Sequence, residues 1–242
     1  MEELRLDFNI RRQPDDTTCG PTCLHSIYAF YKDPIDLREV ISQTPEWVDG
    51  GTLAVYLACH ALGRGYRTTI IPYNLRVFDP TWFDLPAREI GEKLRRQLAH
   101  KKDRPGLAVV TNAYLEYIRL GGRLRFEVIT PSLIRRYLKR SIPILAGLSA
   151  TYLYGSAREV DTGGEVFYDD IRGESNGHFV VLTGYSREDR GVRIADPLKS
   201  NPIAGERYYS VPIYRLVCAL MLGVLTYDGN LLIIELKKKR GP

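Results

Sequence analysis

A cysteine stands at the expected start of a helix in the stretch "QPDDTTCGPTC", residues 13–23. Apolar residues recur after it at helical spacing, which predicts a helix over about 19–32. Thr17 and Thr18 offer capping oxygens and Pro21 suits a first turn, so Cys19 is expected at the helix N-terminus. Unpaired N–H groups and the positive end of the helix dipole favour a thiolate there and lower a cysteine pKa from about 8.5 to roughly 3.5–7.5. This setting predicts a nucleophile.

A thiolate nucleophile needs a partner that exchanges protons with it, usually a histidine, and the chain has His25, His60, His100 and His178. His25 lies six positions after Cys19 and points elsewhere, and His60 lies inside another expected helix. His100 ends a charged helix, a common place for histidine. His178 follows Asn-Gly and begins an apolar strand, so its ring is expected to face out from the end of a sheet. We therefore predict that His178 is the base.

The strand that begins at His178 is expected to form a hairpin with the strand over 191–197. In that register residue 196 lies opposite about residue 180, so Asp196 falls diagonally across from His178 on the same face. Pro197 restricts Asp196 to an extended conformation, which helps to hold a carboxylate against an imidazole. A nucleophile, a base and an orienting acid together follow the logic of a catalytic triad.

An oxyanion hole completes such a site, and Gln13 lies six residues before Cys19. Its side-chain amide can donate a hydrogen bond beside the Cys19 N–H, where the charge of a tetrahedral intermediate develops. The other cysteines, Cys23, Cys59 and Cys218, are expected to pack in the interior. A metal site at Cys19 and Cys23 lacks a second pair at ligand spacing, so no metal is expected.

Several elements now stand in a fixed order: Gln13, then "CGPTCL", a later "GHFVVLTGY" and then "IADP". In this order the chain resembles a papain-like cysteine peptidase, closest to the bacteriocin-processing branch that cuts leader peptides after double glycine. The segment "GGTLAVYLACHALG" at 50–63 also resembles the second helix region of that family. The resemblance covers roughly the first 70 residues and 142–197. It implies a peptide or protein substrate, no cofactor, and the roles of oxyanion donor, nucleophile, base and orienting acid for Gln13, Cys19, His178 and Asp196.

The pattern of elements predicts an α+β fold in which the nucleophile helix packs against an antiparallel sheet. Helices are expected over about 19–32, 35–43, 52–62, 87–102, 111–120 and 131–139. Strands are expected over 66–73, 125–130, 142–149, 178–185, 191–197, 207–211 and 231–236.

We expect a single domain over 1–242, with a helical lobe over about 1–140 and a sheet lobe over about 141–236. An insert over about 74–140 belongs to the first lobe, and a basic tail occupies 237–242. The loop over 155–177 carries a net charge of −4. It is expected as a solvated hairpin, with the alternative that it walls the cleft and favours basic peptides.

The net charge of +5 is scattered, and its one run, "KKKR" in the tail, is expected to be solvated, so no nucleic-acid partner is predicted. The longest apolar run, over 216–227, is too short for a membrane span and is expected as a buried helix. Nothing at the N-terminus resembles a secretory signal, and the cysteines are too few for a disulfide framework, so a cytoplasmic location is predicted.

The sequence thus predicts a cysteine peptidase that hydrolyses a peptide or amide bond through a Cys-His-Asp triad and a thioester acyl-enzyme. A transpeptidase or other acyltransferase using the same triad is one alternative, and a catalytically silent peptide-binding module is another. The resemblance to processing peptidases comes without the membrane and ATPase domains that usually follow them, which favours a stand-alone member. Substrate identity and oligomeric state are left open.

Overall fold

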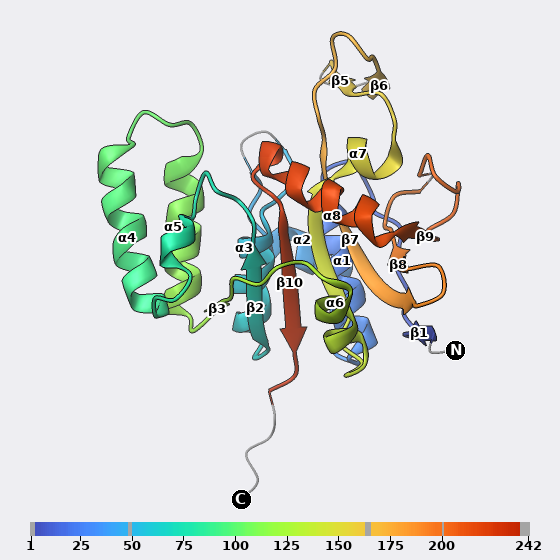
Figure 1. Cartoon of the computed structure of the whole chain (residues 1–242), viewed down its shortest axis with the longest axis horizontal. Coiled ribbons are helices and arrows are strands. Elements are labelled where there is room, and N and C mark those ends of the chain that lie inside the picture. Colours follow the sequence, from blue (N-terminus) through green and yellow to red (C-terminus); the bar gives the residue numbers. More distant parts are fainter. Residues whose placement is uncertain (1–2, 48–49, 163–165, 200, 238–242) are drawn as a thin grey trace, which may run out of the picture.

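A mixed sheet of eight strands forms the centre of the computed structural model, which describes residues 3–47, 50–162, 166–199 and 201–237 (Figure 1). The strands follow the order β3-β2-β10-β4-β7-β8-β9, and β1 pairs with one end of β7. Neighbours are antiparallel except for β2 and β3. The strands are β1 (Glu3–Arg5), β2 (Arg67–Pro72), β3 (Arg123–Leu124), β4 (Ile144–Ser149), β7 (Gly177–Ser186), β8 (Gly191–Ala195), β9 (Tyr208–Pro212) and β10 (Asn230–Glu235).

Helices cover both faces of this sheet (Figure 1). One face carries α1 (Cys19–Phe30), α2 (Leu37–Gln43), α3 (Ala54–Gly63), α4 (Ala87–His100) and α5 (Leu107–Arg119). The other carries α6 (Pro131–Leu138), α7 (Ala150–Tyr154) and α8 (Ile213–Leu222). Two short 3-10 turns are η1 (Pro80–Trp82) and η2 (Gly223–Thr226).

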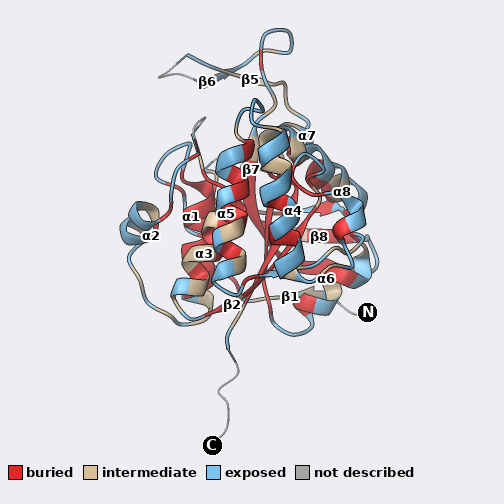
Figure 2. Ribbon diagram, turned by 90° about the vertical axis from the view of Figure 1, so that its left-hand side faces the viewer, coloured by how far each residue is buried: buried red, intermediate tan, exposed pale blue. Residues whose placement is uncertain are grey.

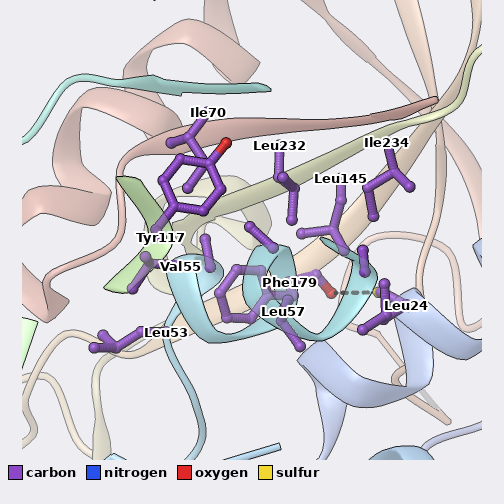
Figure 3. Close-up of a cluster of buried hydrophobic side chains, with 14 of the residues drawn as sticks. Leu24, Leu53, Val55, Leu57, Ile70, Tyr117, Leu145, Phe179, Leu232 and Ile234 are labelled. Atoms are coloured by element: carbon purple, nitrogen blue, oxygen red, sulfur yellow. Dashed lines mark hydrogen bonds between the residues drawn. The ribbon is translucent and has the colours of Figure 1, made fainter. Parts of the chain in front are cut away.

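Successive side chains along each strand point to opposite faces of the sheet, so the buried residues form two clusters, one on each face. Leu145 of β4 joins the cluster under α1, α3 and α5, whereas its neighbour Ala146 joins the cluster under α6, α7 and α8. In the first cluster the Phe179 ring of β7 lies among side chains of α1 and α3 (Figure 3). The Cys23 thiol donates to the Phe179 carbonyl over 3.3 Å (Figure 3). This packing fixes the start of α1 beside the start of β7.

The expected α+β class is confirmed, and the expected helices all form. The predicted strand over 125–130 is wrong, because only Arg123–Leu124 pair with β2. Phe126 stacks instead on Phe83, with ring centroids 3.8 Å apart, and Val128 is 80% exposed. Phe126 therefore packs against aromatic rings, whereas Val128 packs against nothing in the interior and the segment forms no ladder with any described strand.

Strands from both sides of the expected lobe boundary near residue 140 belong to the same sheet. β2 pairs with β10 along its whole length, and β1 pairs with β7. Within the expected insert, α4 and α5 pack on each other and stand at one side of the sheet (Figure 1). The expected basic tail lies outside the described residues from Lys238 onward.

The acidic loop forms a small hairpin of β5 (Glu159–Asp161) and β6 (Val166–Tyr168), and a solvated hairpin is what the sequence predicts. It projects from the body above the end of the sheet where β7 begins, and its surface is largely exposed (Figure 2). The apolar run over 216–227 is helical but only partly buried, because Met221, Leu222 and Leu225 are exposed. The prediction of a buried helix there is therefore wrong on one face.

Candidate active site

Cys19 is the first residue of α1, and its side chain is buried. The predicted threonine cap does not form: the Thr18 hydroxyl pairs with the main chain of Asp15 and makes no capping hydrogen bond. The N–H groups of the first turn therefore have no side-chain acceptor and lie next to the sulfur. A Cβ at Gly20 would lie 3.1 Å from the Phe179 ring, so a glycine at this position lets the tip of the helix approach β7 closely.

His178 lies at the start of β7, opposite Leu148 of β4, and is buried. Its Nε2 lies 2.9 Å from Asp196 Oδ1. Burial lowers the pKa of His178, but the charges of Asp196 and Cys19, with a hydrogen bond to each, outweigh it and raise the pKa to about 10. Because Nε2 is engaged by Asp196, Nδ1 is the ring nitrogen left for Cys19. A single imidazole therefore interacts with both Cys19 and Asp196.

Asp196 is fully buried directly after β8. Val181 lies opposite Ala195, so the predicted pairing of residue 196 with about residue 180 continues the observed register. The carboxylate accepts hydrogen bonds from the Tyr154 hydroxyl at 2.8 Å and the Tyr209 hydroxyl at 2.7 Å, both on Oδ2. Burial raises the pKa of Asp196, but His178, Tyr209 and the Leu198 N–H outweigh it and hold the pKa below its ordinary value.

Gln13 lies beside the same loop, because its N–H donates to the Pro197 carbonyl over 2.9 Å. Its side chain is buried, and Nε2 donates to the Asp15 carbonyl over 2.8 Å. An amide nitrogen carries two hydrogens, so one remains for another acceptor. Asp15 also bonds Thr18, the residue before Cys19, and this loop thereby holds Gln13 close to the start of α1.

The remaining histidines have other surroundings. His60 Nδ1 lies 2.8 Å from the Tyr28 hydroxyl, and Nε2 lies 3.0 Å from Gln43 Oε1. His25 is buried in α1, where burial lowers its pKa. His100 is the exposed last residue of α4. None of the three is bonded to Cys19 in the part of the chain that the structure describes.

The other cysteines divide by exposure. Cys23 is fully buried, and burial raises its pKa, as expected for a packing residue. Cys59 is half-buried, and burial raises its pKa to about 12. Cys218 is exposed, so its predicted packing role is wrong. It lies on the outer face of α8, whose apolar sequence does not reveal which side is covered.

Three residues near Asp196 and His178 were not predicted from the sequence. Tyr154 ends α7, a helix too short to show periodicity, and Tyr209 lies on β9 beyond a long loop. Asp228, between η2 and β10, is buried and carries a pKa raised well above its ordinary value by burial, partly offset by the charge of His178. It was not expected at the site.

The described residues contain neither a cluster suited to a metal ion nor a helix suited to a membrane span. No group of three or more His, Cys, Asp or Glu side chains gathers there as a metal site would require. No helix among them has both the length and the hydropathy needed to cross a bilayer.

Residues 111–215 match the model of the Peptidase_C39 like family, a segment that contains His178, Asp196 and both tyrosines. The chain is a cysteine peptidase that is similar to the C39-like family over this segment. No curated protein matches it. A crystal structure described as a C39-like peptidase from Bacillus anthracis aligns with 99% of this peptidase and 100% of its own chain, at 14% identity and a TM-score of 0.50. That similarity supports the papain-like fold.

Two further crystal structures are similar to the peptidase at a lower TM-score of 0.45. One is a double glycine motif protease from an AMS/PCAT transporter in complex with the leader peptide, at 14% identity over 96% of this chain and 94% of that one. The other is Xylellain, a cysteine protease from Xylella fastidiosa, at 13% identity over 98% and 86%.

Proposed function

We propose that the peptidase hydrolyses a peptide bond through a thioester on Cys19, with His178 as proton carrier, Asp196 as orienting acid and Gln13 as oxyanion donor. The observation that carries the proposal is the single imidazole that bonds a buried carboxylate through Nε2 and whose pKa is raised by both Asp196 and Cys19. An imidazolium held in this way stabilises a neighbouring thiolate, which is the attacking form of cysteine.

The first half of the reaction forms the thioester. Cys19 Sγ attacks the scissile carbonyl carbon, and the carbonyl oxygen takes the negative charge. The free hydrogen of Gln13 Nε2 and the Cys19 N–H are the donors for that oxygen. As the C–N bond breaks, the His178 imidazolium gives its proton to the leaving amine.

The second half releases the acyl group. Neutral His178 takes a proton from water as the water oxygen attacks the thioester carbonyl. The C–S bond breaks, the acid product leaves, and the Cys19 thiolate again faces the imidazolium. Asp196 stays ionised throughout, because its role is to orient the ring and to stabilise its positive charge.

Alkylation by iodoacetamide from pH 4 to 9, read by mass spectrometry, tests the ion pair. Cys19 is expected to react rapidly well below pH 7 in the wild type and to lose this reactivity in His178→Ala. The exposed Cys218 serves as the internal control for a solvent-accessible thiol outside the site. Labelling of Cys19 that rises only above about pH 8 in both proteins would refute the pair.

Hydrolysis itself is tested with peptide libraries and the Cys19→Ala variant, which is expected to be inactive. An added amine distinguishes the acyltransferase alternative, because a coupled product would then accumulate in place of the acid. A silent binding module would bind peptides equally well before and after the substitution and would release no product.

A cytoplasmic site of action is also part of the proposal. Cys19, Cys23, Cys59 and Cys218 are all free thiols in the structure. Free thiols of this number are typical of a reducing compartment. Localisation by fractionation, with periplasmic and membrane markers as controls, tests this point.

A further inference from the structure

A second buried carboxyl group lies beside the proposed catalytic residues and has no part in the mechanism above. Asp228 is 5% exposed and spans two neighbouring strands at the end of the sheet. A Cβ at Gly147 of β4 would lie 3.0 Å from its Oδ1, and a Cβ at Gly177 of β7 would lie 2.9 Å from its Oδ2. Gly177 immediately precedes His178, whose charge acts on Asp228.

A second buried oxygen near Gly147 also lacks a hydrogen-bond partner among the described residues. Asn230 is 3% exposed, and its Oδ1 would lie 3.3 Å from the same Gly147 Cβ. Neither Asp228 Oδ1 nor Asn230 Oδ1 has a hydrogen-bond partner among the described residues. No Lys or Arg of that part of the chain forms an ion pair with Asp228 either. Two buried acceptor oxygens without a donor therefore lie near Gly147, beside the Phe179 ring, whose Cε1 would lie 2.8 Å from the same Cβ.

In the free peptidase, a proton on the Asp228 carboxyl supplies one hydrogen-bond donor. Burial favours the neutral acid of Asp228, and the groups that oppose it are the charge of His178 and a hydrogen bond from Thr226. A protonated carboxyl can donate to the Asn230 oxygen. A ligand that brings its own N–H donors and a positive charge would replace that proton and would satisfy both oxygens with stronger, charge-assisted bonds.

We infer that Asp228 and Asn230 form a specificity subsite for the cationic side chain of a lysine or arginine next to the scissile bond of the peptide substrate. The inference rests on the proposed function, because it places the substrate beside His178. Binding exchanges one proton for one cation: the Asp228 O–H bond breaks, the proton goes to solvent, and the ammonium or guanidinium pairs with the carboxylate. The absence of a side chain at Gly147 and Gly177 keeps the carboxyl next to the strand ends.

The exposed acids of the β5–β6 hairpin are weaker candidates for the same selectivity. Asp169 is already used inside its own turn, where it accepts the N–H groups of Ile171 and Arg172 and pairs with the Arg172 side chain over 2.6 Å. Its neighbour Asp170 is exposed to solvent, where an ion pair contributes little. Asp170→Asn therefore removes the same charge without touching the buried subsite, which makes it the matched control.

The test compares peptide pairs that differ only in charge, arginine against citrulline and lysine against norleucine, at each position around the cleavage site. The wild type is expected to prefer the cationic peptide in kcat/KM by roughly tenfold to a hundredfold. The preference is expected to rise with pH, by at most tenfold per pH unit, while the free Asp228 is protonated. Asp228→Asn should give a ratio near one at every pH, and Asp170→Asn should keep the wild-type ratio. A ratio that survives in Asp228→Asn, or that falls equally in Asp170→Asn, overturns the subsite.

A binding measurement separates the subsite from the proposed hydrolysis. Cys19→Ala and the double variant Cys19→Ala with Asp228→Asn are titrated with the same peptide pairs by calorimetry. Tighter binding of the arginine peptide that disappears in the double variant supports the subsite even if no peptide is cleaved. Equal affinity for arginine and citrulline peptides, or no affinity for either, in Cys19→Ala overturns it. Asn at 228 can donate to Asn230 as the neutral acid does, so the double variant is expected to fold, as circular dichroism can check.

Discussion

The two tyrosines on Asp196 allow a prediction about the pH profile of the peptidase. Tyr154 and Tyr209 donate to the same carboxylate oxygen over 2.8 and 2.7 Å, and all three groups are buried. A hydrogen bond to a charged acceptor contributes about 1.5–3 kcal/mol, and about 1.4 kcal/mol corresponds to a tenfold change in an equilibrium. Replacing either tyrosine by phenylalanine should therefore reduce the ionised fraction of Asp196 by roughly tenfold to a hundredfold at acid pH, where kcat/KM rises as this carboxyl ionises.

The direction of the pKa shift of Asp196 depends on whether the two hydrogen bonds favour the charged or the neutral carboxyl. Donors stabilise the charged form, so their loss raises the pKa of Asp196, and the acid limb of kcat/KM moves to higher pH. A more basic carboxylate also attracts the His178 proton more strongly, so the alkaline limb moves in the same direction. The assay is kcat/KM from pH 4 to 10 for Tyr154→Phe, Tyr209→Phe and the double variant, with thermal unfolding measured in parallel. Loss of activity at all pH values with unmoved limbs would refute the reasoning and leave the tyrosines a purely structural role.

Three further outcomes follow from burial and packing. Native protein treated with iodoacetamide should be labelled at the exposed Cys218 but not at the buried Cys23 until it is unfolded, and native labelling of Cys23 would contradict the packing. Asp228 has a raised folded pKa, so its contribution to stability is complete below its ordinary value near 3.8 and is lost as pH rises through the folded value. The unfolding free energy of Asp228→Asn relative to wild type should therefore increase with pH, and a constant difference in denaturant titrations would oppose this. Gly177→Ala brings a Cβ within 2.6 Å of Thr226 Oγ1 and should cost about 1–3 kcal/mol, whereas Gly63→Ala meets nothing within 4 Å and should change thermal stability little.

Local patterns were sufficient for the parts of the site that lie close together in the chain. The helix that begins at Cys19 follows from periodicity, and the β7–β8 hairpin follows from its short connection, which places Asp196 by register. One detail of that hairpin was not readable: a bulge between Leu182 and Gly184 shifts the pairing of its far end. Bulges depend on local twist, which residue types alone do not specify.

Long-range pairings could not be predicted in the same way. Tyr209 reaches Asp196 because β9 pairs with β8, with Tyr209 opposite Ile194, but the loop between them is too long to set a register. Asp228 reaches Gly147 and Gly177 because β10 inserts beside β4. The expected start of α5 near residue 111 was four residues late, because the helix begins at Leu107. Gly106 precedes it with a φ of 73°, which is not a helical conformation, so the helix cannot begin earlier.

The position of β10 has a consequence for biosynthesis. It is the last strand of the sequence, yet it lies in the interior of the sheet, between β2 and β4. Translation at about 5–20 residues per second would deliver Asp196 roughly 10–35 s after Cys19 and the central strand later still. A nascent chain or a fragment that ends before Asn230 therefore lacks the strand that joins β2 to β4. Cys19 is therefore synthesised long before the central strand that completes the sheet.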